Sequence, residues 1–174
     1  MLLSGSSLHD LELPLGLLLG ILSVLDVLAG GFVHMAPVCS SFVWINLSDH
    51  QRDCFQPLGD DSRGHVQLGN KLVERSVMLL ALAFHVGLYF QLETPRLSKL
   101  ELHPSMQMLI THLGLHHQEL HRNTVFLGDY GAESPKPIWI YALRELDIRP
   151  AVGHSRSTTS SVTEPVTRRT AAAI

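Results

Sequence analysis

The sequence predicts one α/β domain, in which helices flank a mostly parallel sheet. The strongest observation is segment 66–85, where apolar residues recur at helical spacing while Lys71 and Glu74 take the opposite side. Short apolar runs at 32–36 and 88–92 stand on either side of this segment and are typical of strands. A strand, a long helix and a second strand in this order predict a crossover unit with two parallel strands. We expect the second strand to be buried on both faces.

Composition narrows the classes of function. The chain has 174 residues, of which 45% are apolar, enough for one domain with a hydrophobic core. Its net charge of −3 provides no general positive field, so DNA could bind only through a local patch. The two cysteines, Cys39 and Cys54, are too few for a disulfide scaffold and lack the spacing of a cysteine-rich zinc site. We therefore expect an intracellular protein of the nucleus or cytoplasm, with no metal.

The N-terminal elements follow from apolar runs and helix breakers. Residues 1–7 are predicted to be a flexible start, and residues 8–149 form the domain. Pro14 suits the first turn of a helix that reaches about residue 28 and is stopped by Gly30 and Gly31. Pro37 ends the strand at 32–36, because proline removes a ladder donor.

The segment 13–33 also resembles a membrane anchor, so a small membrane-associated protein is one alternative. Its apolar run ends at Asp26, short of the roughly 20 residues that a span needs. No lysine or arginine precedes Arg52, whereas a secretory signal has a basic start. These features favour a buried helix over stable membrane insertion.

The remaining elements are shorter. A polar loop is predicted over 40–64, with an apolar island at 42–45. A helix at 105–115 and strands at 124–127 and 138–141 follow, with turns at 128–131 and 135–137. From residue 150 the composition changes to Ser, Thr, Arg and Ala without aromatic residues, so 150–174 is predicted to be a disordered tail.

Several short motifs stand in a characteristic order where strands are predicted to end. They are Gly30-Gly31, Ala36-Pro37-Val38-Cys39-Ser40-Ser41, Pro57-Leu58-Gly59, Leu92-Glu93-Thr94-Pro95, and Gly128-Asp129-Tyr130-Gly131 before Lys136-Pro137. This order over residues 10–141 resembles the catalytic half of the DNA cytosine methyltransferases that modify ring carbon 5. The resemblance implies a Rossmann-like methyltransferase-type sheet, S-adenosylmethionine as cofactor and DNA as partner.

The resemblance also implies roles for individual residues. Cys39 would attack ring carbon 6 of a flipped cytosine, and Glu93 would hold and protonate the ring nitrogen. A thiolate suits this step because its addition converts the unreactive neighbouring carbon into a nucleophile that a sulfonium methyl donor alkylates. Asp10 would contact the adenine of S-adenosylmethionine, and Pro37 lies in the loop beside the cofactor.

The chain departs from the family pattern in ways that leave a second function open. Val38 separates Pro37 from Cys39, where the family has proline directly before cysteine. The glycine-bearing cofactor motif is missing ahead of the first predicted strand, so we expect a truncated domain that a second chain or an upstream segment would complete. The alternative is a non-catalytic binding or structural remnant of the same fold.

Each candidate residue also has a simpler interpretation. Cys39 could be a buried thiol at a strand end, and Glu93 could cap the next turn or pair with Arg96. Two histidine pairs at helical i, i+4 spacing could supply metal ligands, but they point to different faces, which favours a polar helix surface. The pairs are His112 with His116 and His117 with His121.

Two further groups of residues have open roles. Four arginines surround the proposed site and could contact DNA phosphates or lie in solvent: Arg52, Arg63, Arg75 and Arg96. Trp44 and Trp139 are predicted to anchor the core or a loop.

Overall fold

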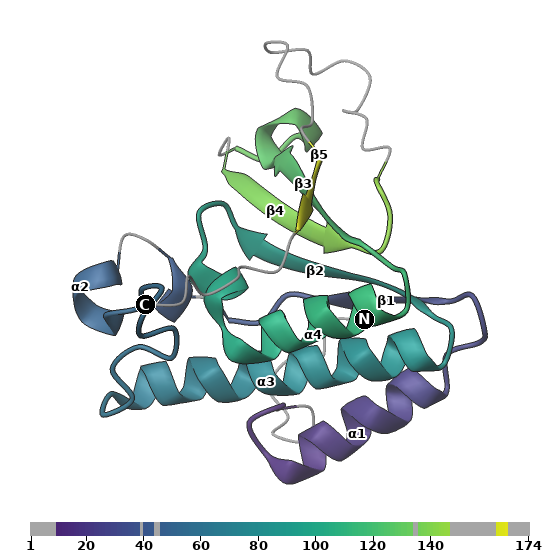
Figure 1. The fold of residues 1–174 in the computed structure, drawn as a ribbon, viewed down its shortest axis with the longest axis horizontal. Helices are drawn as coiled ribbons and strands as arrows, with labels where there is room; N and C mark the ends of the chain where they lie inside the picture. The colour runs from purple at the N-terminus through teal and green to yellow at the C-terminus, as the bar shows by residue number, and fades with distance from the viewer. Residues whose placement is uncertain (1–9, 39, 44–45, 134–135, 147–162, 167–174) are drawn as a thin grey trace.

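The computed structural model describes residues 10–38, 40–43, 46–133, 136–146 and 163–166, and they form an α/β fold (Figure 1). A five-stranded sheet is combined with helices, as the sequence predicts. The helices are α1 (Pro14–Leu25), α2 (Leu47–His50), α3 (Gly64–His85) and α4 (Pro104–Leu115). The strands are β1 (Phe32–Met35), β2 (Tyr89–Pro95), β3 (Leu120–Phe126), β4 (Pro137–Ala142) and β5 (Thr163–Val166). Short 3-10 turns are η2 (Ser40–Phe42), η4 (Lys99–Leu102) and η5 (Leu127–Tyr130).

The sheet has the strand order β1-β2-β4-β3-β5, and its pairings are mixed. β1 and β2 are parallel, which confirms the predicted crossover through α3. The other pairings, β2 with β4, β4 with β3 and β3 with β5, are antiparallel. The prediction of a mostly parallel sheet is therefore wrong. The physical reason is that β4 returns between β2 and β3, so each of these strands meets an antiparallel neighbour.

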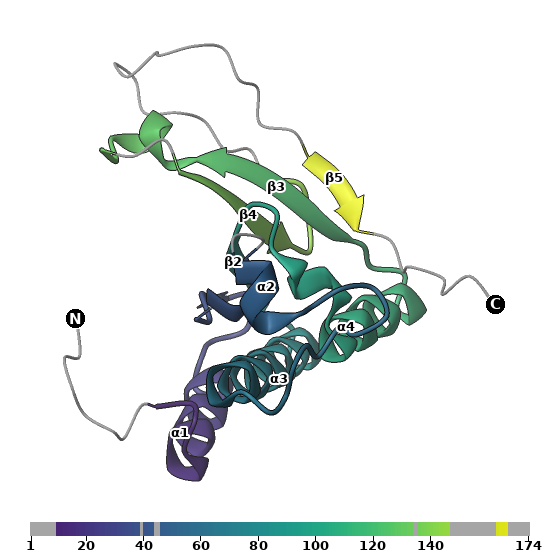
Figure 2. The same ribbon diagram turned by 90° about the vertical axis from the view of Figure 1, so that its left-hand side faces the viewer.

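Strand direction nevertheless follows a simple rule. Because β2 and β3 are both antiparallel to β4, they run in the same direction as each other and as β1. Each of these three strands follows a helix along the chain: α1, α3 or α4. Figure 2 shows α3 and α4 on one side of the sheet, with α1 beyond α3. The ends of β1, β2 and β3 consequently point to one edge of the sheet.

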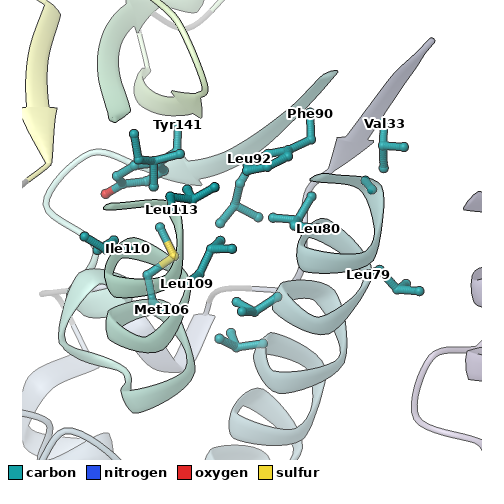
Figure 3. Close-up of a cluster of buried hydrophobic side chains, with 14 of the residues drawn as sticks. Val33, Leu79, Leu80, Phe90, Leu92, Met106, Leu109, Ile110, Leu113 and Tyr141 are labelled. Carbon is teal, nitrogen blue, oxygen red and sulfur yellow. The ribbon is translucent and has the colours of Figure 1, made fainter. Parts of the chain in front are cut away.

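The core lies between the sheet and the helices α3 and α4. In Figure 3, Phe90 and Leu92 of β2 point toward Leu80 of α3 and Leu109 of α4. Phe90 and Leu92 are each 1% exposed, while the alternating positions of β2 are half-buried or exposed. The prediction that this strand is buried on both faces is therefore wrong: only the face toward the helices is fully covered. The other face is left for polar side chains.

The ends of α3 and α4 follow from local chemistry. Gly87 has φ of +77°, a left-handed conformation that glycine adopts without a Cβ penalty, and it ends α3 as predicted. The Leu88 amide then bonds back to the carbonyl of Ala83 at 2.9 Å. At the start of α4, His103 Nδ1 accepts a hydrogen bond from the Ser105 amide at 3.3 Å, and Pro104 occupies the first turn.

The helix α1 packs against α3 on one face only. Its leucines at positions 15, 18, 22 and 25 are 48–53% exposed, which corrects the prediction of a buried helix. They lie at helical spacing and form an apolar stripe on the outer face. None of the helices in the described part of the chain combines the length and apolar character needed to cross a membrane.

Two predictions near the C-terminus need revision. β3 begins at Leu120, four residues before the predicted 124. Its first part contains polar residues, which do not form an apolar strand pattern in the sequence but pair with β5. Of the predicted tail 150–174, the structure describes Thr163–Val166, and these residues form β5 rather than disordered chain. Pairing of Arg122 with Glu164 across the strands explains how a polar segment can join the sheet edge.

Candidate functional site

The edge where β1, β2 and β3 end collects the motifs identified in the sequence. Met35 is paired with Leu92, so the segment 36–38 leaves β1 beside residues 93–95, which continue β2 to its end at Pro95. β3 runs in the same direction and continues into η5, which contains Gly128, Asp129 and Tyr130. In open α/β sheets, ligands bind outside the carboxyl ends of the strands. Cys39 itself lies outside the described residues.

Glu93 lies on the sheet face that is turned away from the helices. Its carboxylate is 3.8 Å from His34 Nε2 on β1, and the two side chains are 36% and 42% exposed. The side-chain amide of Gln91 lies 2.8 Å from His34 Nδ1, which it can donate to when that nitrogen is unprotonated. That tautomer presents the Nε2 proton toward Glu93. This pairing with a neighbouring strand replaces the predicted pairing with Arg96.

The residues expected to bind the cofactor are not gathered around Glu93. Asp10 Oδ1 accepts a hydrogen bond from the Glu12 amide at 2.8 Å, and its carbonyl accepts one from Leu13 at 3.0 Å. These bonds close the turn before α1, which packs on α3 and thus lies on the helix side of the sheet. Glu93 lies on the opposite face. Pro37 is half-buried at the β1 end, two residues beyond the strand.

A buried arginine organises the loop that follows β1. Arg52 is completely buried, although the sequence placed it among possible DNA contacts or surface residues. Its Nε donates to the Ser41 carbonyl at 2.7 Å, and Nη1 donates to Asn70 Oδ1 at 2.7 Å and to the Pro57 carbonyl at 3.0 Å. The guanidinium also lies 3.8 Å from the centre of the Phe42 ring. Burial lowers the Arg52 pKa to about 10, so it remains cationic at neutral pH.

Two buried histidines complete this loop cluster. The His50 ring accepts the Arg52 amide at Nδ1 and lies 2.9 Å from the Val43 carbonyl through Nε2. His103 packs edge-on against Phe42, with ring centres 5.9 Å apart. Burial, and secondly the charge of Arg52, lowers the His103 pKa to about 4. Its Nε2 is buried without a hydrogen-bond partner in the described residues. The neutral ring therefore suits its place beside a cation.

The other arginines near this edge have mainly local partners. Arg63 forms ion pairs with Asp49 and Asp60, which connect α2 to the start of α3. Arg75 donates to the Leu11 carbonyl and thereby links α3 to the turn before α1. Arg96 is exposed just after β2. The expectation of a local basic patch for DNA stays a prediction.

A second polar cluster lies on the helix side of the sheet. Arg122 Nη1 of β3 donates to Glu101 Oε1 of η4 at 2.6 Å, and Tyr141 of β4 donates its hydroxyl to the same oxygen at 2.9 Å. The Arg122 guanidinium lies 4.3 Å from the centre of the Trp139 ring. These residues come from three separate segments, and the sequence analysis identified only Trp139. No local sequence pattern links these residues, because Glu101 lies in η4 and Arg122 precedes the predicted strand at 124–127.

One of the two predicted histidine pairs is found in the structure. His112 of α4 and His116, the residue directly after this helix, have ring centres 4.8 Å apart, and His85 at the end of α3 lies 4.8 Å from His112. His117 and His121 do not share a helix, because His117 lies in a turn and His121 in β3. In the described part of the chain, no three histidine, cysteine or carboxylate side chains are arranged to hold a metal ion.

Comparison with known proteins leaves the family open: no protein-family model, curated protein or solved structure matches this chain.

Proposed function

We propose that this chain supplies the base-binding half of a methyltransferase-like site for cytosine in DNA. Cys39 would add to ring carbon 6, and Glu93 would bind the ring at its nitrogen edge. A non-catalytic relative that still binds DNA is the second candidate. The placement of Asp10 favours that alternative, because it separates the expected cofactor residue from Glu93.

One observation carries the proposal. The parallel pairing of β1 and β2, with Met35 opposite Leu92, directs the segment that leads to Cys39 and the segment 93–95 to the same edge. A nucleophile on one strand end and an acid on the next is an arrangement that an open α/β sheet provides.

The methyl donor would be S-adenosylmethionine, which provides an electrophilic methyl group. Asp10 does not fit the expected contact with its adenine, since the carboxylate closes the turn before α1 on the helix side of the sheet. A site for the donor would have to be formed by residues other than Asp10. The base-binding step can be tested without it.

The test uses duplex DNA in which the target cytosine is replaced by 5-azacytosine. A thiolate that adds to ring carbon 6 forms a carbon–sulfur bond, and the neighbouring ring nitrogen takes up a proton, so the adduct persists without a methyl donor. We expect a covalent protein–DNA complex that resists denaturing electrophoresis. Its formation should disappear in Cys39→Ser.

Cys54 provides a matched control because it is an exposed free cysteine in the same loop region. Cys54→Ser should form the adduct at the parental rate, whereas Glu93→Gln should slow it by about 10²-fold or more, as loss of general acid catalysis does. Adduct formation that survives Cys39→Ser would overturn the assignment of the nucleophile. Saturable DNA binding without any adduct would instead support the non-catalytic candidate.

A further inference from the structure

The second polar cluster borders an open cavity of about 480 Å³ next to the end of β2. Leu97, Lys99 and Glu101 line it from the segment that follows β2, and Arg122 and Trp139 line it from the sheet. Cavities of this size hold small ligands. The cavity lies on the helix side of the sheet, whereas Glu93 points to the other side. It is therefore a separate site from the proposed cysteine–glutamate pair.

One wall is a flat surface suited to an aromatic ring. The Arg122 guanidinium is stacked on the Trp139 indole and is held there by Glu101 and by Glu164 of β5. Burial acts to lower the Arg122 pKa, but the hydrogen bond with Glu164 and the charge of Glu101 outweigh it and raise the pKa overall. The wall therefore keeps its positive charge at neutral pH. Indole rings and guanidinium planes are the groups on which proteins stack nucleobases.

Glu101 supplies a hydrogen-bond acceptor whose carboxylate is held in place by two donors. Arg122 and Tyr141 both donate to Oε1, so Oε2 has no hydrogen-bond partner among the described residues. Burial, followed by the charge of Glu101, raises the Tyr141 pKa well above its usual value, so its hydroxyl remains a donor. The carboxylate is therefore held by one oxygen, while the other can accept a hydrogen bond from a ligand.

The remaining wall comes from the segment directly after β2. Leu97 has φ of +65°, a left-handed conformation that is costly for a residue with a branched side chain. Such outliers persist where surrounding structure fixes them, and they are concentrated in ligand sites. Lys99, two residues further on, is half-buried and adds a positive charge at the cavity.

We propose that this cavity binds a nucleotide whose base carries an exocyclic amine, as cytidine monophosphate does. The base packs against the wall formed by Arg122 and Trp139, its amine donates to Glu101 Oε2, and its phosphate pairs with Lys99. A carboxylate accepts a hydrogen bond from the cytosine amine but has no such donor to meet at the corresponding carbonyl of uracil. The site therefore selects cytidine over uridine. It requires neither Cys39 nor a methyl donor, so its test is independent of the proposed function.

The experiment measures tryptophan fluorescence in the full chain carrying Trp44→Phe, which leaves Trp139 as the reporter. Cytidine monophosphate should quench the emission in a saturable manner, with an affinity about tenfold higher than that of uridine monophosphate. Free N-acetyltryptophanamide corrects for absorption by the nucleotides. Calorimetric titration of the parent protein with each nucleotide gives the two affinities without relying on fluorescence.

Three variants locate the contacts. Glu101→Gln keeps the size and the oxygen that Arg122 and Tyr141 contact, and it should reduce the preference for cytidine to less than about twofold. Lys99→Met should weaken both nucleotides equally, while Lys71→Met, an exposed lysine on α3, should change neither. Circular dichroism confirms that the variants are folded.

The outcomes separate clearly. Saturable binding with a cytidine preference that depends on Glu101 supports the site. Equal binding of the two nucleotides, an unchanged preference in Glu101→Gln, or no heat and no quenching at millimolar nucleotide would each overturn it.

Discussion

The Arg52 guanidinium reaches back eleven residues to the carbonyl of Ser41, to which its Nε donates at 2.7 Å. The same group contacts Asn70 of α3, so one side chain connects η2, the following loop and the long helix. A loop of this length would otherwise lose much conformational entropy for few contacts. The shape of the sheet edge after β1 therefore depends on a buried cation that satisfies several carbonyl and side-chain oxygens at once.

Replacement of this arginine should be strongly destabilising. Arg52→Met fills much of the volume but leaves the Ser41 carbonyl and Asn70 Oδ1 without their donor. We expect the free energy of unfolding to fall by about 3 kcal/mol, since unpaired buried polar groups cost about 1–3 kcal/mol each. Urea denaturation followed by circular dichroism measures this change. Arg96→Met, at an exposed position, should change stability by less than about 0.5 kcal/mol. Equal effects of the two variants would contradict the role assigned to Arg52.

Gly69 in α3 faces the same cluster. A Cβ added there would lie 2.2 Å from Ser41 Oγ, a hydroxyl that also contacts Arg52 at 3.2 Å. Gly69→Ala should therefore destabilise the protein by about 1–3 kcal/mol through overpacking, despite the better helix propensity of alanine. Ser41→Ala should recover part of this loss when combined with it.

Gly64 at the start of α3 is the matched control. A Cβ added at Gly64 meets no atom within 4 Å, so Gly64→Ala should leave stability unchanged or raise it by up to about 1 kcal/mol. The comparison uses the same helix and the same substitution. If Gly69→Ala is as well tolerated as Gly64→Ala, the close packing of η2 on α3 is not present in solution.

The order of strands and helices could be predicted because it depends on local patterns. The apolar spacing of 66–85 marks α3, and the runs beside it mark β1 and β2, whose parallel pairing follows from the helix between them. The position of β4 between β2 and β3 depends on pairing between segments far apart in the sequence, and local patterns in one sequence do not predict such pairing. The exposed face of α1 was missed for a related reason: apolar composition indicates a tendency to be buried but does not identify a partner.

The candidate site was predictable only in part. The motif order predicted parallel strands whose ends lie together, and the pairing of Met35 with Leu92 confirms this. The predicted strand end at 92 is wrong, because residues 93–95 continue β2 through their pairing with β4. Arg52 was missed because most of its partners are backbone carbonyl groups, which carry no residue-specific signal. Glu101 and Arg122 are 21 positions apart and meet only through the packing of η4 on the sheet. Glu101 lies in η4 and Arg122 precedes the predicted strand at 124–127, so neither residue stood out as a charge inside a predicted strand.

Leucines on the two packed helices should differ sharply in their contribution to stability. Leu80 of α3 is fully buried in the core, whereas Leu22 of α1 is 53% exposed. Leu80→Ala should lower the free energy of unfolding by about 2–5 kcal/mol, because it removes buried methyl groups and leaves a cavity. Leu22→Ala should cost less than about 1 kcal/mol. Urea midpoints at two protein concentrations measure both values. A large, concentration-dependent effect of Leu22→Ala would mean that the outer face of α1 is covered in solution.

The final prediction concerns pH and follows from the buried imidazole of His103. Burial, and secondly the charge of Arg52, lowers its pKa from 6.5 to about 4 in the folded protein. Between these values the unfolded chain binds the proton more strongly than the folded one, so stability rises with pH across this window. The stabilising contribution is complete above about pH 6.5 and is lost as the pH falls toward 4.

His103→Asn isolates this contribution, because asparagine cannot take up a proton and still caps the start of α4. Between pH 7 and pH 4.5 the parent protein should lose about 2–3 kcal/mol more stability than the variant does. Urea titrations at both pH values give this difference, and the other histidines cancel because both proteins contain them. Parallel pH dependence of the two proteins would show that folding does not lower the pKa of His103. In that case the imidazole would not be buried in neutral form beside the Arg52 cation. The packing of His103 against Phe42 and Arg52 would then be wrong.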